Sequence, residues 1–287
     1  MLVSPRYDGP PIISITGRPG DQLAPVLRQR RRLEAMLVDL DDADWSSASR
    51  CDDWTVQDVV AHMVGVNTFW NASVRAGLGG TPTRLLVGFD PATTPALMVD
   101  AMRDLAPQEI LDQFVTSNET FLGVLAQLDD TGWTTLAESP AGHVPIRMVA
   151  HHALWDCWIH ERDIALPLGL NPPLEPDEVA SCLRYAAALS PALAIGTGHL
   201  LGGRFAVEAT DPSLSCLLDV GESVTVRDGR APPEVPCLRG EAVPLVEALS
   251  IRTPMPASVP PEWLRLLGGL AAAFTADAPL PRSPRPR

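Results

Sequence analysis

The segment HHALWDCWIHERDIA, residues 151–165, holds the densest group of side chains that could do chemistry. Residues four apart lie on the same face of a helix, so Asp156 and His160 point in one direction. His152 lies one turn earlier on the same stripe. A carboxylate and an imidazole at this spacing form a two-ligand clamp, the geometry that paired histidines use in helical zinc motifs. The spacing predicts part of a divalent-metal site, and a tight site needs a third ligand from another helix.

His62 is the best candidate for that third ligand. It shares a helical stripe with Val59 and Val66, which is otherwise apolar, so we expect it to face the interior. An imidazole there must find a partner, because an unsatisfied buried polar group costs about 1–3 kcal/mol. Spacing alone leaves two alternatives open. His62 could be a hydrogen-bonded core residue, and the Asp/His pair could be a surface ion pair.

The elements that must position these side chains are predicted to be helices. Thr55 followed by Asp58 forms a start like a capping box, with Asp in place of Glu or Gln. Apolar periodicity and breaker residues predict helices at about 21–40, 55–77, 94–104, 107–128, 145–167 and 176–194. Residues 1–20 are rich in Pro and Gly, which predicts a flexible N-terminal extension, and residues 276–287 are predicted to be a disordered tail.

The pattern of apolar residues changes from helical to strand-like after residue 203. Short β-branched or alternating runs (RFAVEAT, CLLDV, SVTVRD) are separated by Asp211-Pro212, Gly221 and Asp228-Gly229, a pattern typical of strands and turns. Two short helices are predicted near residues 240–250 and 261–274. The sequence therefore predicts a helical-bundle domain over residues 21–195 and a small α+β domain over residues 196–275.

Composition narrows the class of protein. The net charge of -13 over 287 residues argues against nucleic acid or an anionic membrane as a partner, because phosphate binding needs a concentrated basic face. All 22 basic residues are arginine, which excludes lysine-dependent catalysis and indicates a GC-rich bacterial genome. The five cysteines lack a CxxC pair, and neither a signal peptide nor a spanning segment is evident. We expect a cytoplasmic protein with a small-molecule partner; monomer and homodimer are both open.

Two segments carry a resemblance to a known family. CDDWTVQDVVAHMVG, residues 51–65, resembles the first signature of the mycothiol-dependent maleylpyruvate isomerase family within the DinB-like superfamily. WDCWIHERDIALPLG, residues 155–169, is similar to its second signature, and the order and separation of the two also fit. The resemblance covers roughly residues 20–275 and includes a part similar to the small sterol-carrier-like domain attached in many members.

The resemblance implies a DinB-like four-helix bundle that holds one divalent metal, most readily zinc, on His62, Asp156 and His160. Three protein ligands leave a position open for catalysis. In thiol-dependent members that position takes the sulfur of mycothiol, the thiol of actinobacteria, and zinc lowers the pKa of the thiol. Asp156 departs from the Glu that is usual in the isomerases.

The resemblance also implies a catalytic arginine in the C-terminal part. Arg252, in the segment LSIRTP, falls at the matching place, although Ile251 replaces a glycine of the family pattern. Arg252 is therefore predicted to clamp a carboxylate of the substrate. An exposed surface arginine is the open alternative.

Three hypotheses of function follow. The first is a zinc-dependent and mycothiol-dependent S-transferase or isomerase that acts on a small electrophilic substrate through a metal-bound thiolate. The second is a thiol-independent metal hydrolase in which the open position holds water. The third is a non-catalytic accessory protein that binds a small apolar ligand in the helical cavity.

Overall fold

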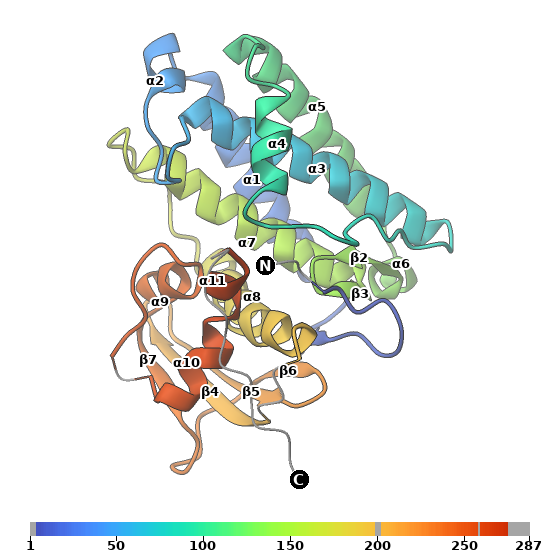
Figure 1. Ribbon diagram of the computed structural model, residues 1–287, viewed down its shortest axis with the longest axis vertical. Helices are drawn as coiled ribbons and strands as arrows, with labels where there is room; N and C mark the ends of the chain where they lie inside the picture. Colours follow the sequence, from blue (N-terminus) through green and yellow to red (C-terminus); the bar gives the residue numbers. More distant parts are fainter. Residues whose placement is uncertain (1–3, 199–201, 258, 275–287) are drawn as a thin grey trace.

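Four long helices form the upper part of the molecule in Figure 1. The structure is a computed structural model that describes residues 4–198, 202–257 and 259–274. The four helices are α1 (Leu23–Val38), α3 (Val56–Leu78), α5 (Pro107–Leu125) and α7 (Ile146–Ala165). Contacts run from α1 to α5, α5 to α3, α3 to α7 and α7 back to α1, which closes the ring of a four-helix bundle. Shorter helices flank the bundle: α2 (Asp42–Ser46), α4 (Thr94–Asp100) and α6 (Asp130–Thr134).

Helix α3 begins as its sequence predicts. The Thr55 hydroxyl accepts a hydrogen bond from the Asp58 backbone N–H at 3.2 Å, and the Asp58 carboxylate accepts one from the Thr55 N–H at 2.9 Å. This capping box satisfies two N–H groups that lack helical partners. The helix continues through Gly77 to Leu78 and is capped by Gly79. A side chain at Gly77 would collide with the backbone carbonyl of Leu136, so this glycine allows a close approach inside the helix.

The lower part of the molecule is built on one five-stranded sheet of order β1-β6-β5-β4-β7. Strands β4, β5 and β6 are antiparallel neighbours, whereas β7 runs parallel to β4 and β1 parallel to β6. The bounds are β1 (Ile13–Ile15), β4 (Gly203–Thr210), β5 (Leu214–Val220), β6 (Val224–Asp228) and β7 (Cys237–Glu241). Burial alternates along β5, so one face of the sheet packs on the core. The three strands predicted between residues 204 and 228 are confirmed.

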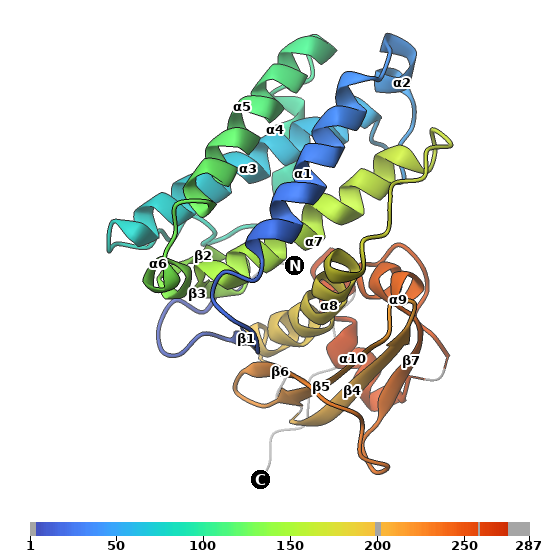
Figure 2. The same ribbon diagram turned by 180° about the vertical axis from the view of Figure 1, so that it is seen from behind.

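Helix α8 (Pro176–Gly196) lies between the bundle and the sheet, with α7 on one side and β1, β5 and β6 on the other. Figure 2 shows this middle position from behind. Of the described helices, α8 alone is long and apolar enough to cross a membrane, but 83% of that window is buried inside the fold. Helix α8 is thus a core helix. It contacts both the bundle and the sheet, so the domain boundary predicted near residue 195 stays a prediction.

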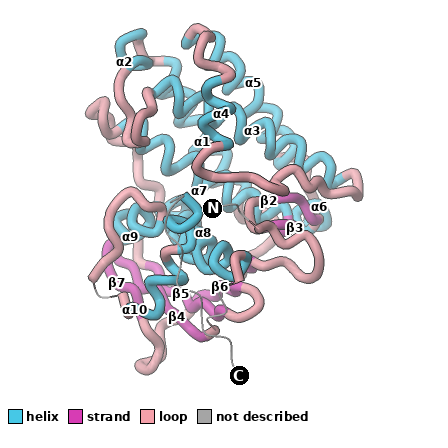
Figure 3. The backbone as a smooth tube through the Cα atoms, in the orientation of Figure 1, coloured by secondary structure: helices cyan, strands magenta, loops and turns pink. Residues whose placement is uncertain are grey.

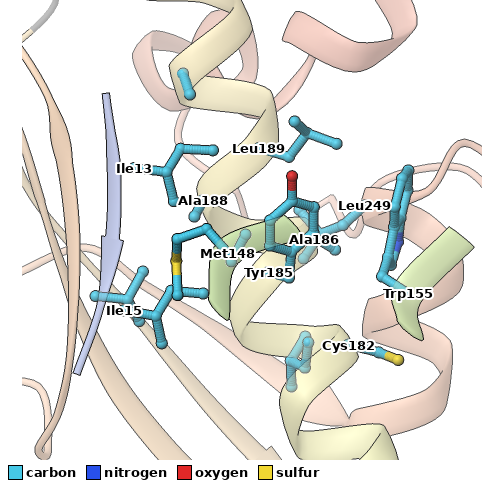
Figure 4. Close-up of a cluster of buried hydrophobic side chains, with 14 of the residues drawn as sticks. Ile13, Ile15, Met148, Trp155, Cys182, Tyr185, Ala186, Ala188, Leu189 and Leu249 are labelled. Atoms are coloured by element: carbon cyan, nitrogen blue, oxygen red, sulfur yellow. The ribbon is translucent and has the colours of Figure 1, made fainter. Parts of the chain in front are cut away.

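Three further helices follow β7 and pack near α8: α9 (Ala242–Leu249), α10 (Pro261–Leu267) and α11 (Gly269–Phe274). The close-up in Figure 4 shows Tyr185 and Leu189 of α8 among side chains from β1, α7 and α9. Trp155 of α7 and Leu249 of α9 belong to this same buried cluster. One continuous core therefore joins the bundle to the sheet.

The prediction of a flexible extension over residues 1–20 is wrong for residues 13–15. Ile13 and Ile15 of β1 are buried and pair in parallel with Val224 and Val226 of β6. A strand of three residues has no periodicity long enough to read, and its partner lies more than 200 residues away. The predicted disordered tail, 276–287, lies outside the described residues.

A second β element was also missed. The segment between the helices predicted at 107–128 and 145–167 contains the hairpin of β2 (Leu136–Ser139) and β3 (Gly142–Pro145), which packs against the end of α3. Figure 3 shows this hairpin as the strand pair nearest the helices, apart from the main sheet. The predicted class, a helical bundle followed by an α+β part, is otherwise confirmed.

Candidate metal centre

Two neighbouring helices bring together the three residues predicted as ligands. His62 lies on α3, whereas Asp156 and His160 lie one turn apart on α7. One ligand atom from each of the three lies within 4.8 Å of the other two. Nε2 of His160 is 3.7 Å from Oδ1 of Asp156, and the two imidazole rings are 5.0 Å apart and nearly perpendicular. The pair of Asp156 and His160 is not a surface ion pair, because both side chains are largely buried. That the three residues bind a metal stays a prediction.

The protonation states of His62 and Asp156 suit a cation. Burial, followed by the neighbouring charge of His160, lowers the pKa of His62 to about 4, so its imidazole is neutral at pH 7 with a free lone pair. Burial opposes ionisation of Asp156, but the nearby His160, His62 and His152 together hold its pKa below the usual range. A neutral imidazole and an ionised carboxylate are the ligand forms that zinc requires.

His160 uses its two ring nitrogens differently. Nδ1 lies 3.0 Å from Oδ2 of Asp163, whose carboxylate is fully buried, so Nδ1 carries the proton and donates it. Nε2 then faces Asp156 and His62. Burial lowers the pKa of His160, but the hydrogen bonds to Asp163 and Cys51 and the charge of Asp156 outweigh it and raise that pKa to about 10. At neutral pH Nε2 therefore carries a second proton, and a divalent cation bound at Nε2 would replace that proton.

Arg252 lies behind Asp163 and contacts it directly. It follows α9 in the C-terminal part, and its Nε and Nη2 donate to the Asp163 carboxylate at 2.9 and 2.6 Å. The pKa of Asp163 is well below its usual range: burial opposes this, but the hydrogen bonds from His160 and Arg252 outweigh it. The alternative of an exposed surface arginine is excluded, because Arg252 is mostly buried in this pair. The predicted clamp on a substrate carboxylate stays a prediction.

Cys51 is a neighbour of the site that spacing did not reveal. Its Sγ donates to Oδ2 of Asp163 at 3.3 Å and lies 3.8 Å from Nδ1 of His160, and Nη2 of Arg252 approaches it at 3.7 Å. Cys51 stands just before α3, more than a hundred residues from these partners. Its position as the first residue of CDDWTVQDVVAHMVG, the segment that resembles the first signature, is the one sequence signal that could have indicated it.

Cys51, His160 and Asp163 form a second group that could in principle hold a metal. The guanidinium of Arg252, 2.6 Å from the Asp163 carboxylate, occupies the place that a cation would need. A divalent ion there would face this positive charge at short range, which is strongly unfavourable away from bulk water. No arginine of the described residues hydrogen-bonds or ion-pairs with His62, Asp156 or His160, so this group is the better cation site.

The other histidines of α7 have protein partners. Nδ1 of His151 lies 2.9 Å from the Ser181 hydroxyl, and Nδ1 of His152 lies 2.8 Å from the Tyr185 hydroxyl. Both rings are almost fully buried, and burial lowers the pKa of His151 to about 3 and of His152 to about 4. These contacts tie α7 to α8. His151 is therefore a core residue.

Comparisons with known proteins agree with the architecture and with the family resemblance. Residues 26–165 match the family model of the "Mycothiol maleylpyruvate isomerase N-terminal domain". One similar structure is the crystal structure of the mycothiol-dependent maleylpyruvate isomerase, with a TM-score of 0.60 and 13% identity over 83% of this chain and 90% of that chain. The crystal structure of a histidine-to-alanine mutant of that isomerase has a TM-score of 0.59 with the same identity and coverage. No curated protein matches the chain by sequence.

At 13% identity these two structures establish a common fold. That fold is a helical N-terminal part followed by a part that contains a sheet. The match of residues 26–165 includes His62, Asp156 and His160, whereas Arg252 lies outside it.

Proposed function

Because residues 26–165 belong to the mycothiol maleylpyruvate isomerase N-terminal domain family, we propose that this chain is a metal- and mycothiol-dependent enzyme. Its reaction would be an isomerisation or an S-transfer on a small electrophilic substrate. The observation that carries the proposal is the convergence of one ligand atom each from His62, Asp156 and His160 within 4.8 Å. Two imidazoles and a carboxylate from two rigid helices make a donor set that fits zinc.

His62, Asp156 and His160 would hold the ion, with zinc as the best fit to nitrogen and oxygen donors. Three protein ligands leave one position for an exchangeable group. When bound, the metal would lower the pKa of a thiol at that position and present it as a thiolate at neutral pH. A thiolate is a far better nucleophile than a thiol, and its addition to an electrophilic carbon would begin isomerisation or transfer.

The residues around the site would hold the ligands in place and shield them. Asp163 keeps the proton on Nδ1 of His160, so that Nε2 is left for the ion. Arg252 fixes Asp163 from behind and brings a positive charge to the edge of the site. Trp54 packs against the His62 ring with centroids 5.4 Å apart and would help to fix the orientation of that ring.

The first experiment measures metal in the purified full chain by mass spectrometry, beside His62→Ala and Asp156→Ala variants. We expect about one zinc ion per chain in the unchanged protein and almost none in the variants, because two remaining ligands do not make a tight site. His143→Ala is a matched control, since His143 hydrogen-bonds the carbonyls of Tyr7 and Thr83 away from the site. Equal metal in all four proteins would refute the site.

A second experiment tests the use of the thiol. Calorimetry with mycothiol should show binding coupled to proton release in the zinc-loaded chain and not in Asp156→Ala, because a metal-bound thiol loses its proton. Supplying mycothiol with electrophiles such as unsaturated small acids should then give a thiol adduct or an isomer. A chain that binds metal but shows no effect of mycothiol would contradict the thiol-dependent reaction and favour the thiol-independent metal hydrolase.

A further inference from the structure

Arg30 of α1 carries a charge inside the four-helix bundle. The residue is only 1% exposed. Its Nη1 donates to the side-chain oxygens of Asn67 at 2.6 Å and Asn118 at 3.0 Å, and its Nη2 donates to the carbonyl of Ala153 at 3.3 Å. The ring of Phe121 lies against the guanidinium, with 5.0 Å between the guanidinium carbon and the ring centroid. All of these partners are neutral.

No carboxylate compensates this charge at contact distance. Among the described residues Arg30 forms no ion pair, whereas the other three arginines of α1 each pair with a glutamate. The carboxylate of Glu34 lies on the far side of the Asn118 amide, and the Nε–H of Arg30 is buried without a partner. A guanidinium keeps its charge when buried, and a buried charge costs free energy that a counter-charge normally offsets. Arg30 therefore leaves an uncompensated positive charge in the bundle.

This charge lies about one helical turn from the predicted metal ligands. Asn67 is five residues after His62 on α3, and Ala153 is three residues before Asp156 on α7. The two helices run antiparallel in Figure 1, so both contacts lie on the same side of the ligands. At 1.5 Å per residue, they are about 5–8 Å from the ligands along the helix axes. Burial opposes ionisation of Asp156, but the neighbouring histidines and, to a smaller extent, Arg30 hold its pKa below the usual range.

The charges around the open metal position can be counted. A divalent ion held by one carboxylate and two neutral imidazoles keeps one net positive charge. The neighbouring pair of Asp163 and Arg252 adds none, because the two charges cancel. Arg30 adds a second positive charge from inside the bundle, where bulk water does not screen it. Neutral water gains little from this excess, whereas an anion is strongly attracted.

We propose that Arg30 makes the open position of the metal centre select an anionic ligand, such as a thiolate, over neutral water. The inference rests on the proposed function, because it needs a divalent ion on His62, Asp156 and His160. Arg30 would not touch the reacting atoms and would act through the electric field that it imposes on the open position. This role also accounts for the buried charge, since an apolar side chain of similar length would fill the same space without that cost.

The test uses the full chain loaded with cobalt(II) in place of zinc, because the absorbance of cobalt changes when a ligand binds. Azide, a small anion without a thiol, is the probe. Arg30→Met keeps the length of the side chain and removes its charge. We expect azide affinity to fall about tenfold and cobalt affinity to rise about tenfold, because one positive charge near both ions is removed. Arg30→Gln also removes the charge, keeps a polar group beside Asn67 and should behave in the same way.

Two further variants separate charge from packing. Arg30→Lys keeps the charge but loses the planar fork that reaches several partners, so azide affinity should stay within about threefold of the unchanged chain. Arg31→Met is the matched control: Arg31 pairs with Glu119 at 3.5 Å and its side chain is 63% exposed, so water screens its charge and neither affinity should change. Azide affinity that falls equally in Arg30→Lys and Arg30→Met, or cobalt affinity that falls in Arg30→Met, would overturn the proposal and assign Arg30 to packing.

The outcomes also separate this inference from the proposed function. An unchanged chain that binds neither zinc nor cobalt would refute the metal centre and, with it, this role of Arg30. A chain that binds cobalt, with equal azide affinity before and after Arg30→Met, would refute the role of Arg30 alone. Azide affinity that depends on Arg30, in a chain that does not respond to mycothiol, would support the role of Arg30 and refute the use of that thiol.

Discussion

The two ring nitrogens of His160 face two unlike environments. On the Nε2 side, His62 and Asp156 converge on one point. On the Nδ1 side, Asp163 and Cys51 are just as close, but Arg252 already pairs with the carboxylate. Both sides contain a carboxylate and a second donor, so composition alone does not distinguish them. The guanidinium of Arg252 distinguishes the two sides. It pairs with Asp163 on the Nδ1 side, so that this carboxylate orients His160, whereas the Nε2 side can accept a cation.

Among the substitutions on the two sides of His160, Asp156→Asn should lower zinc affinity the most. The amide keeps the shape of the side chain but loses the charge that faces His160 at 3.7 Å. We expect zinc affinity to fall by more than the roughly 100-fold that loss of an outer partner can cost. Competition with a chelator measures this affinity. Unchanged affinity would mean that the ion does not use the Nε2 side.

Asp163→Asn should weaken zinc binding by about 10–100-fold, the range found when the partner of a metal-bound histidine is removed. The substitution also leaves the buried guanidinium of Arg252 without its carboxylate, which destabilises the fold. Combining it with Arg252→Met removes the unpaired charge and should restore stability but not affinity. Recovery of both quantities in the double variant would show that Asp163 acts on folding alone.

His151 gives a pH test on a histidine of α7 outside the site. Burial lowers its pKa to about 3, below the value of about 6.5 in the unfolded chain. The unfolded state thus binds more protons between these pH values, so the stability that neutral His151 contributes is present above pH 6.5 and is lost as pH falls toward 3. From pH 7 to pH 5 this loss is about 2 kcal/mol.

Urea unfolding of the unchanged chain and of His151→Gln at pH 7 and pH 5 measures the difference. The variant should lose less stability over this interval, since glutamine can still reach Ser181 but does not titrate. Identical losses in the two proteins would contradict the assignment of a buried neutral imidazole.

Cys51→Ser should have the smallest effect. The thiol lies on the Nδ1 side, and a hydroxyl can still donate to Asp163. We expect zinc affinity to change by less than about threefold, well below the cost of losing an outer partner. A large loss would reverse the comparison, because it would show that the ion is bound by Cys51, His160 and Asp163.

Much of the site could be predicted from local spacing. The capping box at Thr55 sets the start of α3 and with it the face on which His62 lies. The four-residue interval between Asp156 and His160 places both on one face of α7. These relations are encoded within a few turns of helix, where chain geometry alone determines which side chains are neighbours. The convergence of the two helices came instead from the family resemblance.

The environment of the site could not be predicted in this way. Asp163 is only three residues from His160, but its pairing with Arg252 spans 89 residues and the contact of Cys51 with Arg252 spans 201. The same limit applies to β1, whose partner strand β6 lies more than 200 residues later in the chain. No periodicity links such segments.

The sequence by itself determined the long helices, the three strands between residues 203 and 228 and the spacing of Asp156 and His160, because each depends on neighbours along the chain. Only the tertiary structure decided which nitrogen of His160 faces Asp156 and His62, and that Arg252 pairs with a carboxylate of the protein. Those facts depend on how α7 and the turn after α9 pack together, and packing is determined by the whole core.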